Sequence, residues 1–363
     1  MAASRTNVAN ANRSGKSGTM SHSHAHETPD ILTEHGGNLA AARRRFPSAP
    51  LPWIDLSTGI NQAPYPVGSL TSELWERLPE ADAIEKLEAQ AAVTYGTKKP
   101  NLVVAAPGTQ ALIQLLPRIL PARTVGILDF TYAEHGKCWE NAGATVKTVT
   151  DPHELSLFDI GIIVNPNNPD GRIVDVETLL SISNKLASKN GHLIVDEAFI
   201  DVLDPTLSLV PLVEQCQAII LRSFGKTYGL AGLRLGFAIA PREIAARIRA
   251  NLGPWAISGP AIDIGMHALA DADWLAETSV RLQSDVKRLD QLLLTLGLEP
   301  LGGSALFRLA KSVNASSAFN ALAENGILVR AFRDKPNWLR FGMPGTEAGW
   351  SLLENRTRGL KLS

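Results

Sequence analysis

Lys226 has the most distinctive chemical surroundings of any residue in this sequence. It lies in Ser223–Thr227, directly after an apolar run, and Arg234 follows closely. A lysine amine can capture a carbonyl group, and hydroxyl groups beside an arginine can hold a phosphate. The nearby glycines do not form a dinucleotide-binding fingerprint, because they lie between two predicted strands. The segment is therefore a candidate nucleophile and phosphate site, with a solvated loop lysine as the alternative.

A carboxylate and an amide-rich loop follow two other apolar runs. Asp196 comes directly after His192–Val195. A carboxylate at the end of a buried strand is costly unless it meets a cation, which either a salt bridge or a protonated cofactor ring nitrogen would supply. Asn168 lies in Asn165–Gly171, directly after Ile160–Val164. The residues of this loop are all turn formers, and its prolines would also hold a side-chain amide in place for a ligand oxygen.

A third feature is the Gly108-Thr109 pair, which follows Leu102–Ala106 and opens a helix-like segment. Exposed backbone amides at a helix N-terminus, with the Thr109 hydroxyl beside them, can bind an anion. A plain strand-to-helix turn is the alternative.

These residues need a scaffold that brings strand ends together. Most of the apolar runs are continuous rather than alternating, which is typical of parallel strands covered on both faces. Helix candidates separate them at Thr109–Ile119, Tyr132–Ala142 and Val176–Lys189. Ligands of such sheets bind at the carboxyl ends of the strands. The seven predicted strands are Leu102–Ala106, Thr124–Leu128, Thr145–Val149, Ile160–Val164, His192–Val195, Ala218–Leu221 and Leu235–Ala240.

A second, smaller α/β domain is predicted after residue 245. A long, mostly helical stretch covers Ile264–Leu296, and short strands follow near Leu306–Leu309, Ile327–Val329 and Trp338–Phe341. We therefore divide the chain into a disordered tail (1–30), an N-terminal segment that joins the small domain and the active site (31–79), a large domain (80–245) and a small domain (246–363).

Composition narrows the classes of function. The 363 residues are 45% hydrophobic and carry a formal net charge of −1, which gives no basic surface for nucleic acid or an anionic membrane. No apolar run approaches the roughly 20 residues of a membrane span, and no secretory signal is present. The two cysteines, Cys138 and Cys216, lack metal-ligand spacing, so a reduced cytoplasmic protein is favoured over one with a disulfide.

The tail contains alternating histidines at positions 22, 24 and 26, and a second methionine, Met20, that is a possible start of the chain. Metal binding is one interpretation of the histidines. With no partner ligands nearby, a flexible polar tail is the simpler one.

Together, Asn165–Gly171, Asp196–Phe199 and Ser223–Gly236 resemble the pyridoxal-phosphate (PLP)-dependent aminotransferases of fold type I, class I/II. The resemblance covers nearly all of the chain after residue 30. It implies an α/β fold with a large domain around a mainly parallel seven-stranded sheet and a smaller α/β C-terminal domain. It also implies pyridoxal 5′-phosphate as the cofactor, and no metal.

The resemblance assigns roles residue by residue. Lys226 resembles the lysine that holds the cofactor as a Schiff base, and Asp196 the carboxylate paired with the pyridinium nitrogen. Asn168 resembles the amide that bonds the cofactor's 3′-oxygen. Tyr132 resembles the aromatic residue stacked on the ring, with a core aromatic as the alternative. Arg340 resembles the arginine that clamps the substrate carboxylate. The phosphate cup is carried by Gly108, Thr109, Ser223 and Arg234.

Two positions depart from the pattern of many aminotransferases. Phe199 stands where a tyrosine is common, so a second hydrogen bond to the 3′-oxygen is absent. Leu78 stands near the position of a tyrosine that reaches across the dimer to the cofactor phosphate, so that contact is in doubt.

The N-terminal region is similar to one group within the family. His35–Leu39 and Trp53–Asn61 resemble the opening of the L-threonine O-3-phosphate decarboxylases of cobalamin biosynthesis, above all those of the aerobic pathway, and Phe199 fits that group too. Histidinol-phosphate aminotransferases are the nearest relatives and share Gly326–Arg330 and Leu339-Arg340.

Both groups act on an amino compound that carries a phosphate monoester, so a second anion site beside the cofactor is implied. Arg330 and His35 are its candidates, with Gly59 and Asn61 near the substrate. A surface ion pair is the alternative for Arg330, and an N-cap or packing role is the alternative for His35.

The resemblance thus implies a homodimeric lyase that converts L-threonine O-3-phosphate to (R)-1-aminopropan-2-yl phosphate. The same residues would serve a histidinol-phosphate-type aminotransferase that uses 2-oxoglutarate, so the motifs alone leave both reactions open. A non-catalytic PLP-fold binding or regulatory protein is a more remote alternative, because the chain has no basic DNA-binding region.

Overall fold

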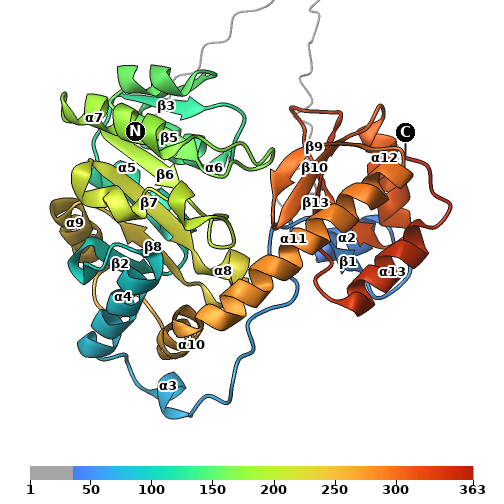
Figure 1. Ribbon diagram of the computed structural model, residues 1–363, viewed down its shortest axis with the longest axis horizontal. Coiled ribbons are helices and arrows are strands. Elements are labelled where there is room, and N and C mark those ends of the chain that lie inside the picture. Colours follow the sequence, from blue (N-terminus) through green and yellow to red (C-terminus); the bar gives the residue numbers. More distant parts are fainter. Residues whose placement is uncertain (1–35, 363) are drawn as a thin grey trace, which may run out of the picture.

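The computed structural model describes residues 36–362, which form two lobes connected by a long helix (Figure 1). The predicted tail, its three histidines and His35 lie outside the described residues. Within residues 36–362, the structure contains no helix that is long and apolar enough to cross a membrane.

The larger lobe is built on a seven-stranded sheet of order β2-β8-β7-β6-β5-β3-β4. Only β8 is antiparallel to its neighbours, β2 and β7, whereas the other pairs of adjacent strands are parallel. The strands are β2 (Val103–Ala106), β3 (Thr124–Leu128), β4 (Thr145–Val149), β5 (Ile160–Val164), β6 (His192–Asp196), β7 (Ala218–Ser223) and β8 (Gly236–Ile239).

Helices cover both faces of this sheet, which explains the continuous apolar runs of its strands. Neighbouring residues of one strand, such as Val103 and Val104, enter two separate hydrophobic clusters on opposite faces. One face is covered by α4 (Ala81–Tyr95), α7 (Val176–Ala187) and α10 (Gly259–Ala270). The other face is covered by α5 (Thr109–Ile119), α6 (Glu134–Asn141) and α9 (Arg242–Leu252).

The smaller lobe combines a four-stranded antiparallel sheet, of order β12-β13-β10-β9, with a two-stranded parallel pair, β1 and β11. Although β1 lies near the N-terminus, it pairs with β11, and residues 53–56 therefore belong to this lobe (Figure 1). Its strands are β1 (Ile54–Asp55), β9 (Glu299–Ser304), β10 (Phe307–Lys311), β11 (Ile327–Leu328), β12 (Arg330–Ala331) and β13 (Trp338–Gly342).

The connecting helix is α11 (Ala272–Thr295), which runs from the large lobe into the small one (Figure 1). The sequence predicts one long helical stretch over 264–296, but the structure breaks it at Asp271. That residue leaves the helical conformation, and its carboxylate caps α11 by accepting a hydrogen bond from the backbone N–H of Trp274, 2.9 Å away. Two helices, α10 and α11, therefore meet there at a corner.

The remaining short elements complete the lobes and their connections. They are α2 (Leu39–Arg45), α3 (Glu73–Glu76), α8 (Phe224–Thr227), α12 (Ala315–Glu324) and α13 (Glu347–Thr357), with 3-10 turns at Pro100–Leu102, Pro152–Leu157, Pro205–Leu207, Val210–Gln215 and Ala231–Leu233.

Candidate active site

The carboxyl ends of the strands of the large sheet open into a cavity, which we call the inner cavity. All eight residues predicted to bind the cofactor line it: Gly108, Thr109, Tyr132, Asn168, Asp196, Ser223, Lys226 and Arg234. Asp196 and Ser223 are the last residues of β6 and β7, and the other six come from loops or helix starts after β2, β3, β5 and β7. Strand ends of a parallel sheet share one edge, so residues far apart in sequence meet here.

One end of the inner cavity is an anion cradle. Gly108 precedes α5 with a positive φ of 81°, and no side chain caps the amides of that helix. A Cβ atom at position 108 would lie 2.7 Å from a terminal nitrogen of Arg234, so a side chain there would push the guanidinium away from the helix N-terminus. Uncapped amides and a guanidinium fit the phosphate of the implied cofactor.

Asp196 forms the buried floor of the cavity. Its Oδ2 atom lies 2.9 Å from Nε2 of His135, and its Oδ1 atom accepts a hydrogen bond from the backbone N–H of Ala198 at 3.1 Å. Both Asp196 and His135 are almost fully buried. No lysine or arginine of the described chain forms an ion pair with Asp196. The carboxylate is therefore held in place by an imidazole and a backbone N–H, and not by a permanently charged side chain. This arrangement fits a cationic ring nitrogen of the cofactor as its partner.

Glu197 points to the opposite side of the strand end. Its carboxylate accepts hydrogen bonds from Ser208 Oγ at 2.7 Å, from the Leu209 backbone N–H at 2.8 Å and from Arg222 at 3.1 Å. Arg222 also pairs with Asp201. These buried contacts anchor the loop after β6, which explains why Asp196 and not Glu197 faces the cavity.

Lys226 also lines the inner cavity, in α8 directly after β7. Burial lowers the pKa of Lys226 to about 8, with a further lowering by the charge of Arg340 and a partial opposing effect of Asp196. Its Nζ atom lies 5.6 Å from the centre of the Phe199 ring. A lysine with this pKa has a far larger neutral fraction near physiological pH than an ordinary lysine, and the neutral amine is the nucleophilic form.

Phe199 occupies the position where a tyrosine is common, and it lines the inner cavity. It packs edge-to-face on Phe307 with 5.0 Å between ring centres. A Cβ atom at position 59 would lie 2.8 Å from the Phe199 ring, so Gly59 allows this close packing. The structure thus places no hydroxyl group at this point of the cavity.

A second cavity, which we call the outer cavity, adjoins the first and shares Tyr132, Asn168, Phe199 and Lys226 with it. The predicted substrate residues Gly59, Arg330 and Arg340 line it. Lys137 and Arg333 add positive charge, while Asp334 is the one acidic lining residue. The outer cavity is therefore strongly cationic.

Arg340 lines the outer cavity and bonds to Asn168, which lines both cavities. Its guanidinium donates one hydrogen bond to Oδ1 of Asn168 and another, of 2.8 Å, to the backbone carbonyl of Ser57. The first bond fixes the orientation of the Asn168 amide, so that its NH₂ group is the donor that remains for a ligand oxygen. Burial, with the nearby charge of Arg330, lowers the pKa of Arg340 to about 9. An anion bound between Arg340 and Arg330 would offset the repulsion between their positive charges.

Asn61 does not line either cavity. It is fully buried behind Lys226, and its amide is engaged with Thr227, Ala63 and Arg281. Asn61 was predicted to lie near the substrate, but in the structure it supports the segment that carries Lys226.

Sequence reasoning missed several lining or supporting residues. His135 gave no signal beyond its position three residues after Tyr132, in the first turn of α6. Ser57 and Thr58 are the two residues before Gly59, and Arg333 follows Arg330 by three residues. Lys137 reaches the outer cavity from α6.

Comparisons with known proteins agree with this geometry. Residues 60–350 match the family described as aminotransferase class I and II. The chain belongs to this family. The prediction of a PLP-dependent family and of pyridoxal 5′-phosphate as its cofactor is therefore confirmed, and the residues of the inner cavity fit that cofactor.

Two relatives are similar over most of their length. The threonine-phosphate decarboxylase of Pseudomonas aeruginosa is 39% identical over 334 residues, which cover 91% of this chain and 98% of that one. The threonine-phosphate decarboxylase of a Sinorhizobium species is 41% identical over 318 residues, covering 87% and 94%.

The fold also matches solved structures. The histidinol-phosphate aminotransferase of Sinorhizobium meliloti, solved in complex with pyridoxal-5′-phosphate, superposes with a TM-score of 0.73 at 20% identity and covers 92% of this chain and 97% of that one. The predicted fold, with its mainly parallel seven-stranded sheet and smaller C-terminal domain, is confirmed.

Proposed function

We propose that the protein is a PLP-dependent lyase that decarboxylates L-threonine O-3-phosphate to (R)-1-aminopropan-2-yl phosphate and CO₂, a step of cobalamin biosynthesis. The observation that carries this proposal is the outer cavity, where Lys137, Arg330, Arg333 and Arg340 lie beside Lys226. A substrate with a carboxylate and a phosphate monoester has two anionic groups and matches such a cavity. The two relatives at about 40% identity carry the name of this activity.

The positions of the arginines suggest a division of labour. Arg340 is buried and bonded to Asn168, so it would hold the carboxylate close to Lys226. Arg330, only partly buried, would hold the phosphate farther out, with help from Arg333 and Lys137. His35, predicted to contribute to the same site, lies outside the described residues and stays a prediction.

Bound pyridoxal phosphate supplies an electron sink for the bond that breaks at the substrate's Cα. Asp196, held by His135, would keep the ring nitrogen protonated. The uncapped start of α5 and Arg234 would hold its phosphate, and Asn168 its 3′-oxygen. Lys226, with a pKa of about 8, can both accept and donate a proton near neutral pH, so it is suited to return a proton to Cα after CO₂ leaves.

The alternative, a histidinol-phosphate-type aminotransferase, would employ the same residues. The solved aminotransferase is 20% identical, a level at which the likeness extends to the fold alone. The decarboxylase is therefore the better supported reaction. A non-catalytic role is disfavoured by the shared cavity of Lys226, Asp196 and Asn168.

Product and cosubstrate analysis tests the proposal. Purified protein loaded with PLP is incubated with L-threonine O-3-phosphate, with unphosphorylated L-threonine and with histidinol phosphate plus 2-oxoglutarate. We expect the aminopropanol phosphate from the first mixture only. Formation of glutamate in the third mixture, or conversion of the cofactor to its pyridoxamine form, would support the aminotransferase instead.

We also propose a cytoplasmic homodimer. The segment around α3 exposes large apolar side chains, with Trp75 69% and Leu78 65% accessible, and Trp255 is 55% accessible. Apolar side chains gathered on a surface mark contact sites between proteins. Equilibrium sedimentation of the holoenzyme should give twice the mass of the 39.0 kDa chain.

A further inference from the structure

The segment of residues 56–65, which we call the strap, lies between the two halves of the site. On one side, the Asn61 backbone N–H donates to the carbonyl of Lys226 at 3.0 Å, and that of Tyr65 donates to the carbonyl of Tyr228 at 2.9 Å. On the other side, the carbonyl of Ser57 accepts a hydrogen bond from Arg340. The strap thus contacts both the lysine and the carboxylate-binding arginine.

Two close backbone approaches show how tightly the strap is held. A Cβ atom at Gly229 would lie 2.4 Å from the carbonyl oxygen of Asn61, on the Lys226 side. A Cβ atom at Gly345, just after β13, would lie 2.5 Å from the side chain of Gln62. Both glycines have a positive φ, so a side chain would be strained there in addition. The strap therefore has little freedom to shift alone.

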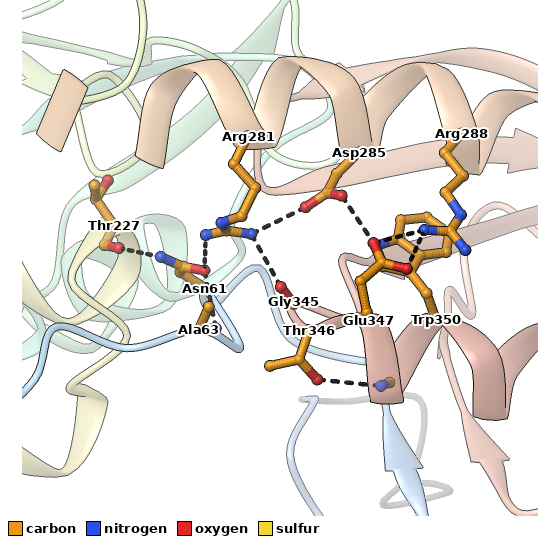
Figure 2. A network of polar contacts seen from close by, with 11 residues as sticks. Asn61, Ala63, Thr227, Arg281, Asp285, Arg288, Gly345, Thr346, Glu347 and Trp350 are labelled. Carbon is orange, nitrogen blue, oxygen red and sulfur yellow. Dashed lines mark hydrogen bonds and ion pairs between the residues drawn. The ribbon is translucent and has the colours of Figure 1, made fainter. Parts of the chain in front are cut away.

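Asn61 contacts the Lys226 loop through its side chain as well as its backbone (Figure 2). Its side-chain NH₂ donates to the carbonyl of Thr227 at 2.9 Å, and its Oδ1 accepts from Arg281 at 2.8 Å. The Asn61 amide is buried, so its orientation depends on these partners.

Arg281 reaches Asn61 from α11, the helix that joins the lobes (Figure 2). Its other terminal nitrogen donates to Asp285 at 2.9 Å and to the carbonyl of Gly345 at 3.3 Å. Asp285 in turn accepts from the indole N–H of Trp350 at 2.9 Å. Trp350 is buried in the core of the small lobe, so the small lobe fixes the guanidinium that fixes Asn61.

We propose that Arg281 is a positioning residue for Lys226. By holding Asn61, it keeps the backbone of Lys226 and Thr227 in a fixed relation to the small lobe that carries Arg340. The amine of Lys226 and the guanidinium of Arg340 then keep the same distance and orientation when substrate binds. This inference rests on the proposed role of Lys226, and it applies whether the bound substrate loses CO₂ or a proton.

A matched pair of substitutions tests the inference. Arg281→Gln removes the charge and shortens the reach to Asn61. Arg288→Gln is the control, because Arg288 lies on the same helix and has a similar side-chain exposure (35% against 30%). Its guanidinium pairs with Glu347 and Glu354 and lies over the Trp350 ring, but it makes no bond to Asn61, Asp285 or Gly345. Arg281→Lys, which keeps a charged donor, is the conservative variant.

We expect Arg281→Gln to lower kcat by about tenfold or more while KM changes by less than about twofold, because the anion-binding residues remain. Arg281→Lys should give an intermediate kcat, and Arg288→Gln should keep the wild-type value. The visible circular dichroism of bound PLP, recorded on each holoenzyme without substrate, should change in Arg281→Gln only.

Wild-type kcat and circular dichroism in Arg281→Gln would overturn the inference, as would equal changes in Arg288→Gln. If Arg281→Gln does not fold, Asn61→Asp carries the same test, since it removes the donor to Thr227 and keeps an oxygen for Arg281. The dichroism needs no substrate, so failure of the decarboxylase assay leaves this test standing and the two failures can be told apart.

Discussion

Nε2 of His135 lies 2.9 Å from Oδ2 of Asp196, beneath the cavity lined by Lys226. Both side chains are buried, so water cannot take the place of either partner in this hydrogen bond. The pair joins α6 to the end of β6 and fixes the carboxylate that we assign to the cofactor's ring nitrogen.

Replacing His135 by leucine should therefore weaken cofactor binding. A buried carboxylate that loses a hydrogen bond forfeits about 1–3 kcal/mol, which corresponds to a PLP dissociation constant roughly 5-fold to 150-fold higher. Absorbance titration of the cofactor-free protein measures it. His153→Leu, at an exposed histidine, is the control and should bind PLP normally. Normal PLP affinity in His135→Leu would contradict the role of the pair.

The pKa of Lys226 predicts a pH profile for the cofactor-free protein. Burial and the charge of Arg340 lower this pKa to about 8, so the neutral amine becomes the major form as the pH rises through 8. Labelling of Lys226 by an amine reagent, followed by mass spectrometry, should have its midpoint there, against roughly 10.4 for an ordinary lysine.

Two substitutions should move that midpoint in opposite directions. Arg340→Met removes a positive charge that disfavours protonated Lys226, so the midpoint should rise. Asp196→Asn removes a negative charge that favours it, so the midpoint should fall. A midpoint near the ordinary value in the unsubstituted protein would mean that Lys226 is solvated and not poised as described.

Arg330 should distinguish phosphorylated from unphosphorylated substrate. A charged hydrogen bond contributes about 1.5–3 kcal/mol, so Arg330→Gln should raise KM for L-threonine O-3-phosphate by roughly tenfold to a hundredfold. Arg308→Gln, in a small-lobe arginine paired with Asp290, should leave KM unchanged. Steady-state kinetics would refute the phosphate assignment if Arg330→Gln kept the wild-type KM.

Gly171 is a sensitive point of contact between the lobes. Its φ is 76°, and a Cβ atom there would lie 1.8 Å from the carbonyl oxygen of Gly303 in β9. Gly171→Ala should lower the free energy of unfolding by about 2 kcal/mol or more and reduce kcat, because Asn168 lies in the same loop. Gly68→Ala has open space around it and should be neutral in denaturant unfolding. Equal stability of the two variants would contradict the close contact.

The sequence predicted the large sheet well because its strands are covered on both faces and read as unbroken apolar runs. β3, β4 and β5 have the predicted bounds, and the others differ by one or two residues at their ends. β9 was missed because Glu299–Ser304 is rich in glycine and only partly buried. Its pairing with β10 depends on the tertiary fold and not on a local pattern.

The residues of the site also fall into those that a local sequence pattern predicts and those that depend on the tertiary fold. Residues directly after apolar runs, such as Asp196 and Lys226, could be found because strand ends of a parallel sheet converge. His135 and Arg281 could not, since each lies inside a helix and acts through a contact with a distant segment. Asn61 was assigned to the substrate from resemblance, and its burial behind Lys226 became visible only when the strap was placed.

The release of CO₂ from carboxyl-labelled L-threonine O-3-phosphate tests the central proposal most directly. Holoenzyme should release one CO₂ for each substrate consumed, without any keto acid, and Lys226→Ala should release none. Consumption of substrate only when 2-oxoglutarate is added, with the label retained in the organic product, would contradict the decarboxylase and identify an aminotransferase.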